Sequence, residues 1–201
     1  ALVRELHARM LEECDYQREA AAQVRFARAF AEDPDIAVPA VIADRCADGV
    51  LTTVWHPGDR LEDLRGGDPS RILRAARALL RFSYGSLLRD GRLQADPHPG
   101  NFLVRPDGSI VALDFGCVRR FDRDTVEAWR TLARVVIEGR RADFLEAMVV
   151  TGQVPRPDRY DVDEGWALHR FCFAPYLEPT FRFERRWWVT GLRFTSPSAR
   201  N

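Results

Sequence analysis

The chain has 201 residues, which suits one domain with a sizeable core or one domain in two lobes. Its 30 basic and 30 acidic residues cancel, and this balance argues against a general nucleic-acid-binding protein, which would carry a basic excess. The basic residues are all arginine, with no lysine in the chain, and the four separated cysteines form no Cys-x-x-Cys pair, so neither a zinc site nor a disulfide framework is indicated.

Residues 2–31 are predicted to be helical. Apolar side chains recur there at helical spacing, first at Leu2, Leu6, Met10, Leu11 and Cys14 and then at Ala20, Ala21, Val24, Ala27 and Phe30. Asp15 is placed to cap the second segment, and Asp33-Pro34 should end it because the residue before proline avoids the α region. The carboxylates of Glu13, Asp15 and Glu19 are the polar groups of interest in this region.

Two short strands are expected next, in residues 38–43 and 50–55. Both runs are β-branched and apolar, and Ala47-Asp-Gly49 separates them, so they are predicted to pair antiparallel. Pro57-Gly58 then turns the chain.

A long helix is predicted from Asp68-Pro-Ser70 to near Gly91. One apolar stripe is expected to mark its buried face: Ile72, Ala76, Leu79, Leu80, Ser83, Tyr84, Leu87 and Leu88. The helix should support the loop that follows it, and no functional residue is assigned to it.

The most specific pattern in the chain runs from residue 94 to residue 116. Asp96 and Asn101 stand five apart, and the Pro-His-Pro-Gly between them favours a rigid loop over a helix. Two apolar runs, 102–104 and 110–113, flank a Pro-Asp-Gly turn, which predicts a hairpin. Because a hairpin brings its outer ends together, Asp96 and Asn101 are expected to meet Asp114.

Two carboxylates and an amide at one place are oxygen ligands for a hard cation such as Mg²⁺. The catalytic loop of protein kinases has the same Asp-x4-Asn spacing before a hairpin and Asp-Phe-Gly. On that template Asp114 chelates Mg²⁺ between the β- and γ-phosphates, Asn101 holds a second Mg²⁺, and Asp96 accepts a proton or orients the nucleophile. His98 is a secondary candidate for the base, ranked below Asp96, because its place between two prolines favours a loop-shaping role near phosphate. The alternative is a polar surface hairpin with an Asp cap.

Residues 117–201 are predicted to be mostly helical. Helices are expected from Asp122 to Gly139, from Ala142 to Val150 and from Asp161 to Phe173. The tail, with its run Phe-Arg-Phe-Glu-Arg-Arg-Trp-Trp over 181–188, is interpreted as aromatic core with exposed arginines. A membrane-interface segment is the alternative.

Two patches together resemble the UbiB/ADCK family of atypical kinases, also called aarF-domain kinases. Asp96-Pro-His-Pro-Gly-Asn101 with Leu113-Asp-Phe-Gly116 carries the resemblance, and Glu13-Cys-Asp-Tyr-Gln-Arg-Glu-Ala-Ala21 is similar to the family's Glu-x-Asp segment and the helix after it. The resemblance extends over about residues 5 to 185. It implies an α+β, protein-kinase-like fold, with a partial small lobe of a helix and two or three strands in 1–56 and a mostly helical large lobe in 57–201.

The resemblance also implies further site residues. Glu19 takes the place of the helix αC carboxylate that pairs with a strand lysine holding the ATP phosphates. Glu13 and Asp15 match the Glu-x-Asp pair, which in the family meets an N-terminal lysine-containing motif. Val54 and Trp55 fall at the hinge, whose backbone normally hydrogen-bonds adenine. The alternatives are solvated helix-face carboxylates for the three acids and core packing for Trp55.

The implied function is an ATP- and Mg²⁺-dependent atypical kinase or ATPase that supports isoprenoid-quinone (ubiquinone) biosynthesis. Its expected partners are a nucleotide and quinone-biosynthesis proteins or lipid-linked substrates at a membrane, with no nucleic acid. One alternative is a nucleotide-binding pseudokinase or scaffold module. Another is a small-molecule phosphotransferase of the aminoglycoside/choline-kinase kind, although such enzymes typically follow Asp-x4-Asn with an acidic motif other than Asp-Phe-Gly.

Only 18 residues precede Glu19, too few for the family's phosphate-covering loop, strand lysine and Lys-x-Gly-Gln segment. We therefore expect a piece of a longer kinase-like protein that by itself binds metal-nucleotide weakly and transfers phosphate poorly. No run of 18 apolar residues and no signal peptide is visible, and we expect a cytoplasmic location, with peripheral attachment at the inner membrane as the alternative.

Overall fold

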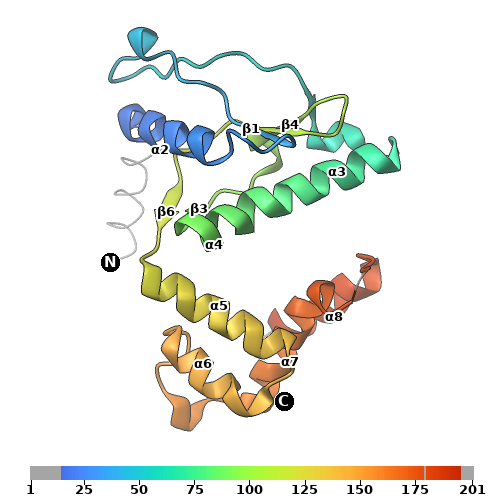
Figure 1. Cartoon of the computed structure of the whole chain (residues 1–201). Coiled ribbons are helices and arrows are strands. Elements are labelled where there is room, and N and C mark those ends of the chain that lie inside the picture. The colour runs from blue at the N-terminus through green and yellow to red at the C-terminus, as the bar shows by residue number, and fades with distance from the viewer. Residues whose placement is uncertain (1–14, 179, 196–201) are drawn as a thin grey trace. The chain divides into compact units, whose positions relative to one another are not determined.

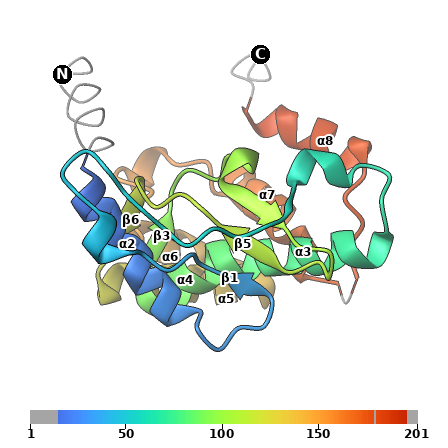
Figure 2. The same ribbon diagram turned by 90° about the horizontal axis from the view of Figure 1, so that it is seen from above.

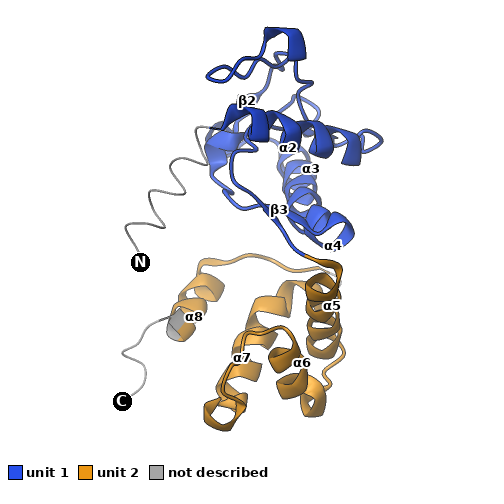
Figure 3. Ribbon diagram, turned by 90° about the vertical axis from the view of Figure 1, so that its left-hand side faces the viewer, with its two compact units in different colours: residues 1–121 blue, residues 122–201 orange. Residues whose placement is uncertain are grey.

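The computed structural model describes residues 15–178 and 180–195 of the chain. The chain divides into two compact units, one ending at Phe121 and the other beginning at Asp122 (Figure 3). Each unit is described by itself below. The lobe boundary predicted near residue 56 lies inside the first unit and stays a prediction.

The first unit opens with helix α2, Tyr16–Ala29. The Asp15 carboxylate accepts a hydrogen bond from the Arg18 N–H at 2.9 Å, so the predicted N-cap is confirmed. One face of the helix is buried through Ala22, Gln23 and Phe26. The earlier part of the predicted helical region, residues 2–14, lies outside the described residues.

A small four-stranded sheet has the order β1-β5-β4-β2. Its strands are β1 Ile36–Ala37, β2 Asp59–Arg60, β4 Phe102–Val104 and β5 Ile110–Ala112. β1 runs parallel to β5, whereas β4 is antiparallel to both β5 and β2. Figure 2 shows β1 beside β5. A second, two-stranded sheet joins β3 Arg92–Gln94 and β6 Val118–Arg120.

The predicted hairpin at 102–113 is confirmed. Phe102 pairs with Ala112 and Val104 with Ile110 across its two strands. Gly108 has φ of +86° in the connecting turn, a backbone conformation that strains side chains with a Cβ. The register fixes which residues of the two runs face each other at the outer end of the hairpin.

The strand pair predicted at 38–43 and 50–55 is present only as an isolated antiparallel bridge, Val41 to Thr53. The backbone N–H groups of Ile42 and Val54 donate across it at 2.9 Å. A 3₁₀ turn, Ala43–Arg45, then breaks the ladder, and the Cys46 sulfur accepts the Thr52 N–H at 3.3 Å. The Cys46 side chain and the 3₁₀ turn thus occupy backbone groups that a longer strand pairing would need, and full strands do not form.

The long helix begins and ends where the sequence predicted. α3, Pro69–Leu80, is capped by Asp68, continues through a π-helical segment, Arg81–Gly85, and then α4, Ser86–Asp90, and stops at Gly91 with φ of +63°. The predicted buried stripe is largely wrong. Ala75, Ala78, Phe82, Ser86 and Leu87 are buried, whereas Ile72, Ala76, Leu80, Tyr84 and Leu88 are exposed.

The reason is the pattern of residue sizes. The small side chains of Ala75 and Ala78 allow close packing on that face, and Phe82 and Ser86 continue the same face at spacings of four residues. Phe82 enters the centre of the unit and is fully buried. α3 runs beneath the sheet in Figure 1.

Five phenylalanines form the centre of this unit. The Phe82 ring lies 5.4–6.3 Å from those of Phe26, Phe30, Phe102 and Phe115, measured between centroids. These rings come from α2 and its end, the π segment, β4 and the Asp-Phe-Gly sequence. The cluster therefore joins the helix that carries Glu19 to the hairpin that carries Asp114.

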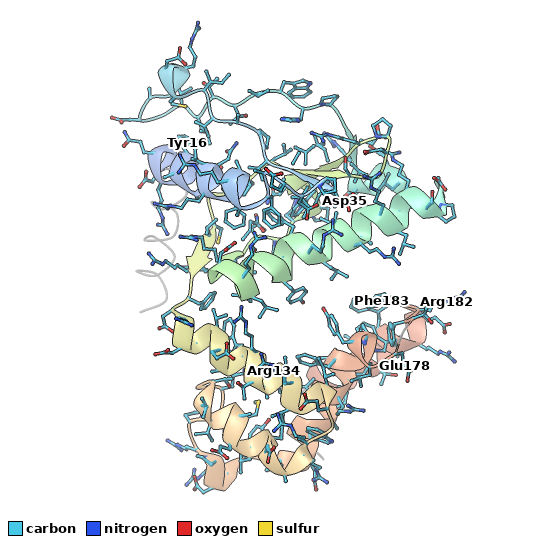
Figure 4. All side chains as sticks on the ribbon, viewed as in Figure 1. Tyr16, Asp35, Arg134, Glu178, Arg182 and Phe183 are labelled. Carbon is cyan, nitrogen blue, oxygen red and sulfur yellow. The ribbon has the colours of Figure 1, made fainter. Side chains whose placement is uncertain are left out.

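An ion-pair network at the surface joins the segment after α2 to α3 and the π segment. Arg81 contacts Asp33 at 3.1 Å and Asp35 at 2.6 Å, and Arg74 contacts Asp35 at 2.7 Å. Figure 4 shows Asp35 beside α3. The hydrogen bonds from Arg74 and Arg81 lower the pKa of the Asp35 carboxyl.

The second unit is helical, with α5 Arg123–Ile137, α6 Phe144–Val150, α7 Val162–Phe173 and α8 Arg185–Thr195. Further 3₁₀ turns in the two units are Leu61–Leu64, Pro99–Asn101, Arg141–Asp143, Pro157–Arg159 and Ala174–Tyr176. The three helices predicted before the tail are confirmed. The core of the second unit consists of Leu132, Val135, Val136, Phe144, Ala147, Met148 and Val154.

In the part of the chain that the structure describes, no helix has the length and apolar character needed to cross a bilayer.

The aromatic tail is only partly core. Trp187 stacks on Phe171 with ring centroids 4.7 Å apart, as the core interpretation requires. Phe183 and Trp188 are instead 53% and 60% exposed. That part of the interpretation is wrong, because a short run of neighbouring rings cannot bury every member against one helix.

Candidate active site

The loop between β3 and β4 holds Asp96 and Asn101 together. The Asn101 Nδ2 donates to the Asp96 carboxylate Oδ2 and to the Asp96 backbone oxygen, each at 3.1 Å. Pro99–Asn101 forms a single 3₁₀ turn, which explains how residues five apart come into contact. Since the amide nitrogen points to Asp96, the Asn101 Oδ1 is left to bind something else.

The outer end of the hairpin brings Asp114 next to this loop. The Leu113 N–H donates to the Asn101 carbonyl at 2.9 Å, one residue before Asp114. The Asp114 Oδ1 accepts the Gly116 N–H at 2.9 Å, which fixes the half-buried carboxylate. Its Oδ2 makes no hydrogen bond to the residues described.

Glu19 reaches the Asp-Phe-Gly segment from α2. Its Oε1 accepts the Phe115 N–H at 3.3 Å. A Cβ built on Gly116 would lie 3.5 Å from the Asp114 Oδ1 and 3.7 Å from the Glu19 Oε2, so both carboxylates flank that glycine. Burial raises the pKa of the Glu19 carboxyl, the Phe115 hydrogen bond opposes this, and the charge of Asp114 raises the pKa further.

The oxygen groups at 96, 101 and 114 are of the kind that Mg²⁺ prefers. Within residues 15–178 and 180–195, no three or more His, Cys, Asp or Glu side chains are grouped so as to hold a metal ion. The donor atoms fit a cation held by the Asp114 carboxylate and the Asn101 amide oxygen, with other ligands supplied by a bound phosphate. This is the usual arrangement for Mg²⁺, which keeps few protein ligands.

A cavity of about 690 Å³ lies in the first unit beside these residues. Val54, Trp55 and His98 line it, as do Leu103 of the hairpin and Leu113, the neighbour of Asp114. Its volume is in the range of pockets for small organic ligands. The sequence-predicted hinge and the predicted catalytic loop thus line one cavity.

His56 and Gly58 shape the hinge side of this cavity. The Arg105 guanidinium lies 2.8 Å from the His56 Nδ1 and can only donate, so that nitrogen accepts. Burial and then the Arg105 charge lower the pKa of His56. A Cβ on Gly58 would lie 2.9 Å from the Leu103 Cβ, so a glycine lets the chain lie against β4.

Not every predicted residue joins the site. Asp15 is exposed and its carboxylate caps α2, one turn before Glu19. Glu13 lies outside the described residues. The functional roles predicted for both remain predictions.

The sequence model of the ABC1 atypical kinase-like domain matches residues 1–148. The chain belongs to this family. The match covers both sheets, the hairpin, the loop with Asp96, all of α5 and most of α6. The predicted α+β, kinase-like fold is therefore confirmed.

Individual proteins support the assignment to the ABC1 family. The chain is 34% identical over 189 residues to the probable protein kinase UbiB of Vibrio cholerae, covering 89% of this chain and 34% of that protein. It is 30% identical over 135 residues to the mitochondrial atypical kinase COQ8B of Rattus norvegicus, covering 67% of this chain and 26% of that protein.

A solved structure is also similar. The Rv3197–erythromycin complex from Mycobacterium tuberculosis matches with a TM-score of 0.75 and 28% identity, covering 94% of this chain and 48% of the other. The chain spans only 34% and 26% of the length of the UbiB and COQ8B relatives.

Sequence reasoning missed three contributors to this ABC1-family site. Gln94 is buried, and its Nε2 donates to the Asp96 carbonyl at 2.7 Å, which steadies the loop. Leu103 and Leu113 line the cavity. The strand alternation that buries Phe102 and Val104 was the available signal for Leu103, since the residue between them must face the other side.

Proposed function

We propose that this chain carries the Mg²⁺- and ATP-binding catalytic part of an atypical kinase or ATPase. The observation that supports it is the hydrogen-bonded path from Asp96 through Asn101 and Leu113 to the Asp-Phe-Gly segment, beside one cavity. Glu19 also contacts the Asp-Phe-Gly segment, since its carboxylate accepts the Phe115 N–H. Phosphoryl transfer needs charge neutralisation and positioning more than covalent chemistry, which this set of groups can supply.

Each residue has a distinct proposed task. Asp114 and the Asn101 amide oxygen would hold Mg²⁺, which when bound supplies positive charge to the phosphate oxygens. The Asp96 carboxylate, oriented by the Asn101 amide, takes a proton from the attacking hydroxyl or water at its free oxygen. Glu19 holds the backbone of the Asp-Phe-Gly segment, and Val54 and Trp55 offer the hinge side of the cavity to the adenine base.

We further propose that the whole protein supports isoprenoid-quinone biosynthesis and works on lipid-linked partners at the face of an inner membrane. Support comes from the similarity to UbiB and COQ8B, which are named as kinases. In cells that lack the protein, quinone content should fall, and the Asp114→Asn variant should fail to restore it. Restoration by that variant would separate quinone synthesis from the nucleotide site.

The direct test is ATP hydrolysis by the wild-type protein and by Asp114→Asn, with Mg²⁺ and with EDTA. We expect the variant and the chelator each to lower hydrolysis by about 10²-fold or more, because the variant removes the one carboxylate proposed as a cation ligand and the chelator removes the cation itself. Calorimetric titration with Mg-ATP, on this chain and on a version extended upstream, measures binding apart from turnover. Equal hydrolysis by wild type and variant would favour a nucleotide-binding scaffold.

A further inference from the structure

His98 has one ring nitrogen committed to its own loop and one that is not. Its Nδ1 accepts the Gly100 N–H at 3.1 Å. A ring nitrogen that accepts carries no proton, so the neutral imidazole carries its proton on Nε2. That second nitrogen makes no hydrogen bond to any residue that the structure describes, and it is a donor.

The loop holds this ring in place. A Cβ on Gly100 would lie 3.0 Å from the His98 Nδ1 and 3.3 Å from Cε1, so the ring edge occupies the space that the glycine leaves. Pro97 and Pro99 fix the backbone φ on both sides. The Asn101 N–H also donates to the His98 carbonyl at 3.0 Å. A side chain fixed in this way loses little conformational entropy when it binds a ligand.

The ring lines the same cavity as Trp55 and Leu113. It stands two residues after Asp96 and three before Asn101, on the turn that carries the proposed cation ligand. A nucleotide with its base at the hinge would therefore have its phosphates at the His98 end of the cavity.

We propose that the His98 Nε2–H donates a hydrogen bond to a phosphate oxygen of the bound nucleotide. This inference rests on the proposed nucleotide site and adds a phosphate-binding residue to it. His98 is then both the cap of the turn, through Nδ1, and a contact to the ligand, through Nε2. A hydrogen bond to a charged acceptor contributes more than one between neutral groups.

Two substitutions separate these roles, because each replaces the hydrogen-bonding function of one ring nitrogen and removes that of the other. In His98→Asn the side-chain oxygen replaces Nδ1 as the acceptor for the Gly100 N–H, and asparagine caps well, but the distal donor is lost. In His98→Gln the amide N–H replaces the distal donor, but the acceptor for Gly100 is lost. The two variants are matched controls for each other.

The experiment titrates ATP and, separately, adenosine into the protein with Mg²⁺. Trp55 is the only tryptophan before residue 122, so a cavity signal in tryptophan fluorescence should vanish in Trp55→Phe, and calorimetry provides a second readout. We expect His98→Asn to weaken ATP binding about ten-fold and to leave adenosine binding unchanged. His98→Gln should keep most of the preference for ATP over adenosine.

The opposite pattern would overturn the inference: ATP affinity unchanged in His98→Asn and reduced in His98→Gln would make His98 a structural cap alone. Equal losses for ATP and adenosine in His98→Asn would do the same, since a phosphate contact cannot affect a ligand without phosphate. If the wild-type protein binds neither ligand, the proposed nucleotide site itself is wrong. Thermal unfolding of each variant identifies any change that comes from loss of fold.

Discussion

Two aromatic clusters in this protein differ in how far they are buried. In the first unit, Phe26, Phe30, Phe82, Phe102 and Phe115 are each at most 5% exposed. In the second, the rings of residues 181–194 are packed partly on Phe171, yet Phe183 and Trp188 are more than half exposed. Arg182 and Phe183 lie together just before α8 in Figure 4.

The difference follows from where the rings come from. The buried cluster gathers side chains from the α2 region, the π segment and the hairpin, which are up to ninety residues apart and surround one another. The exposed cluster comes from one short run, so its members share a single face and cannot all be covered. Aromatic content alone therefore does not indicate a core, and only the first cluster positions residues of the candidate site.

The largest expected effect is that of Phe82→Ala. The ring contacts four other buried rings, and its removal should lower the free energy of unfolding of the first unit by about 3–5 kcal/mol. Hydrogen exchange resolves the two units separately in one urea series. Trp188→Ala is the control from the exposed cluster, with an expected change below about 1 kcal/mol. Similar losses in both variants would break the comparison.

A smaller effect is expected for Asp35→Asn, which keeps the buried cluster but weakens the ion pairs beside it. The hydrogen bonds from Arg74 and then Arg81 lower the pKa of the Asp35 carboxyl, so the charged form is favoured in the fold. We expect a loss of about 1 kcal/mol at neutral pH, because both guanidinium groups are partly screened by water.

The pH dependence gives this prediction its sign. A carboxyl with a lowered pKa stabilises the fold above its unfolded value of 3.8 and loses that contribution as pH falls through the folded value. The difference between wild type and Asp35→Asn should therefore shrink below about pH 4 in urea titrations. A difference that stays constant down to pH 2 would count against the ion pairs as its origin.

The smallest effect has the opposite sign. Burial raises the pKa of Glu19, so the charged form is disfavoured in the fold, and this cost appears as pH rises from 4.5 through the folded pKa. Glu19→Gln keeps an acceptor for the Phe115 N–H and should raise the free energy of unfolding at pH 7 by less than about 1 kcal/mol. The measurement is the difference in free energy of unfolding between wild type and Glu19→Gln at pH 7 and at pH 4. A difference of the same size at both pH values would contradict this prediction.

The sequence by itself determined the local features and their chemistry. The Asp15 cap, the proline and glycine boundaries of the long helix and the 102–113 hairpin follow from the conformational limits of single residues, and all are present. The meeting of Asn101 with the Asp-Phe-Gly segment follows from the hairpin, since pairing two strands fixes their outer ends. The Asp-Pro-His-Pro-Gly-Asn sequence likewise indicated the family.

Only the tertiary structure decided which faces are buried and which groups share a cavity. The helix at 69–90 has apolar residues on two adjacent faces, and packing of Phe82 among the other buried rings selected one of them. The parallel pairing of β1 with β5, the bond from Glu19 to Phe115 and the place of Leu103 in the cavity join residues far apart in the chain. No local preference encodes such contacts, because their free energy depends on the partner that folding brings to each side chain.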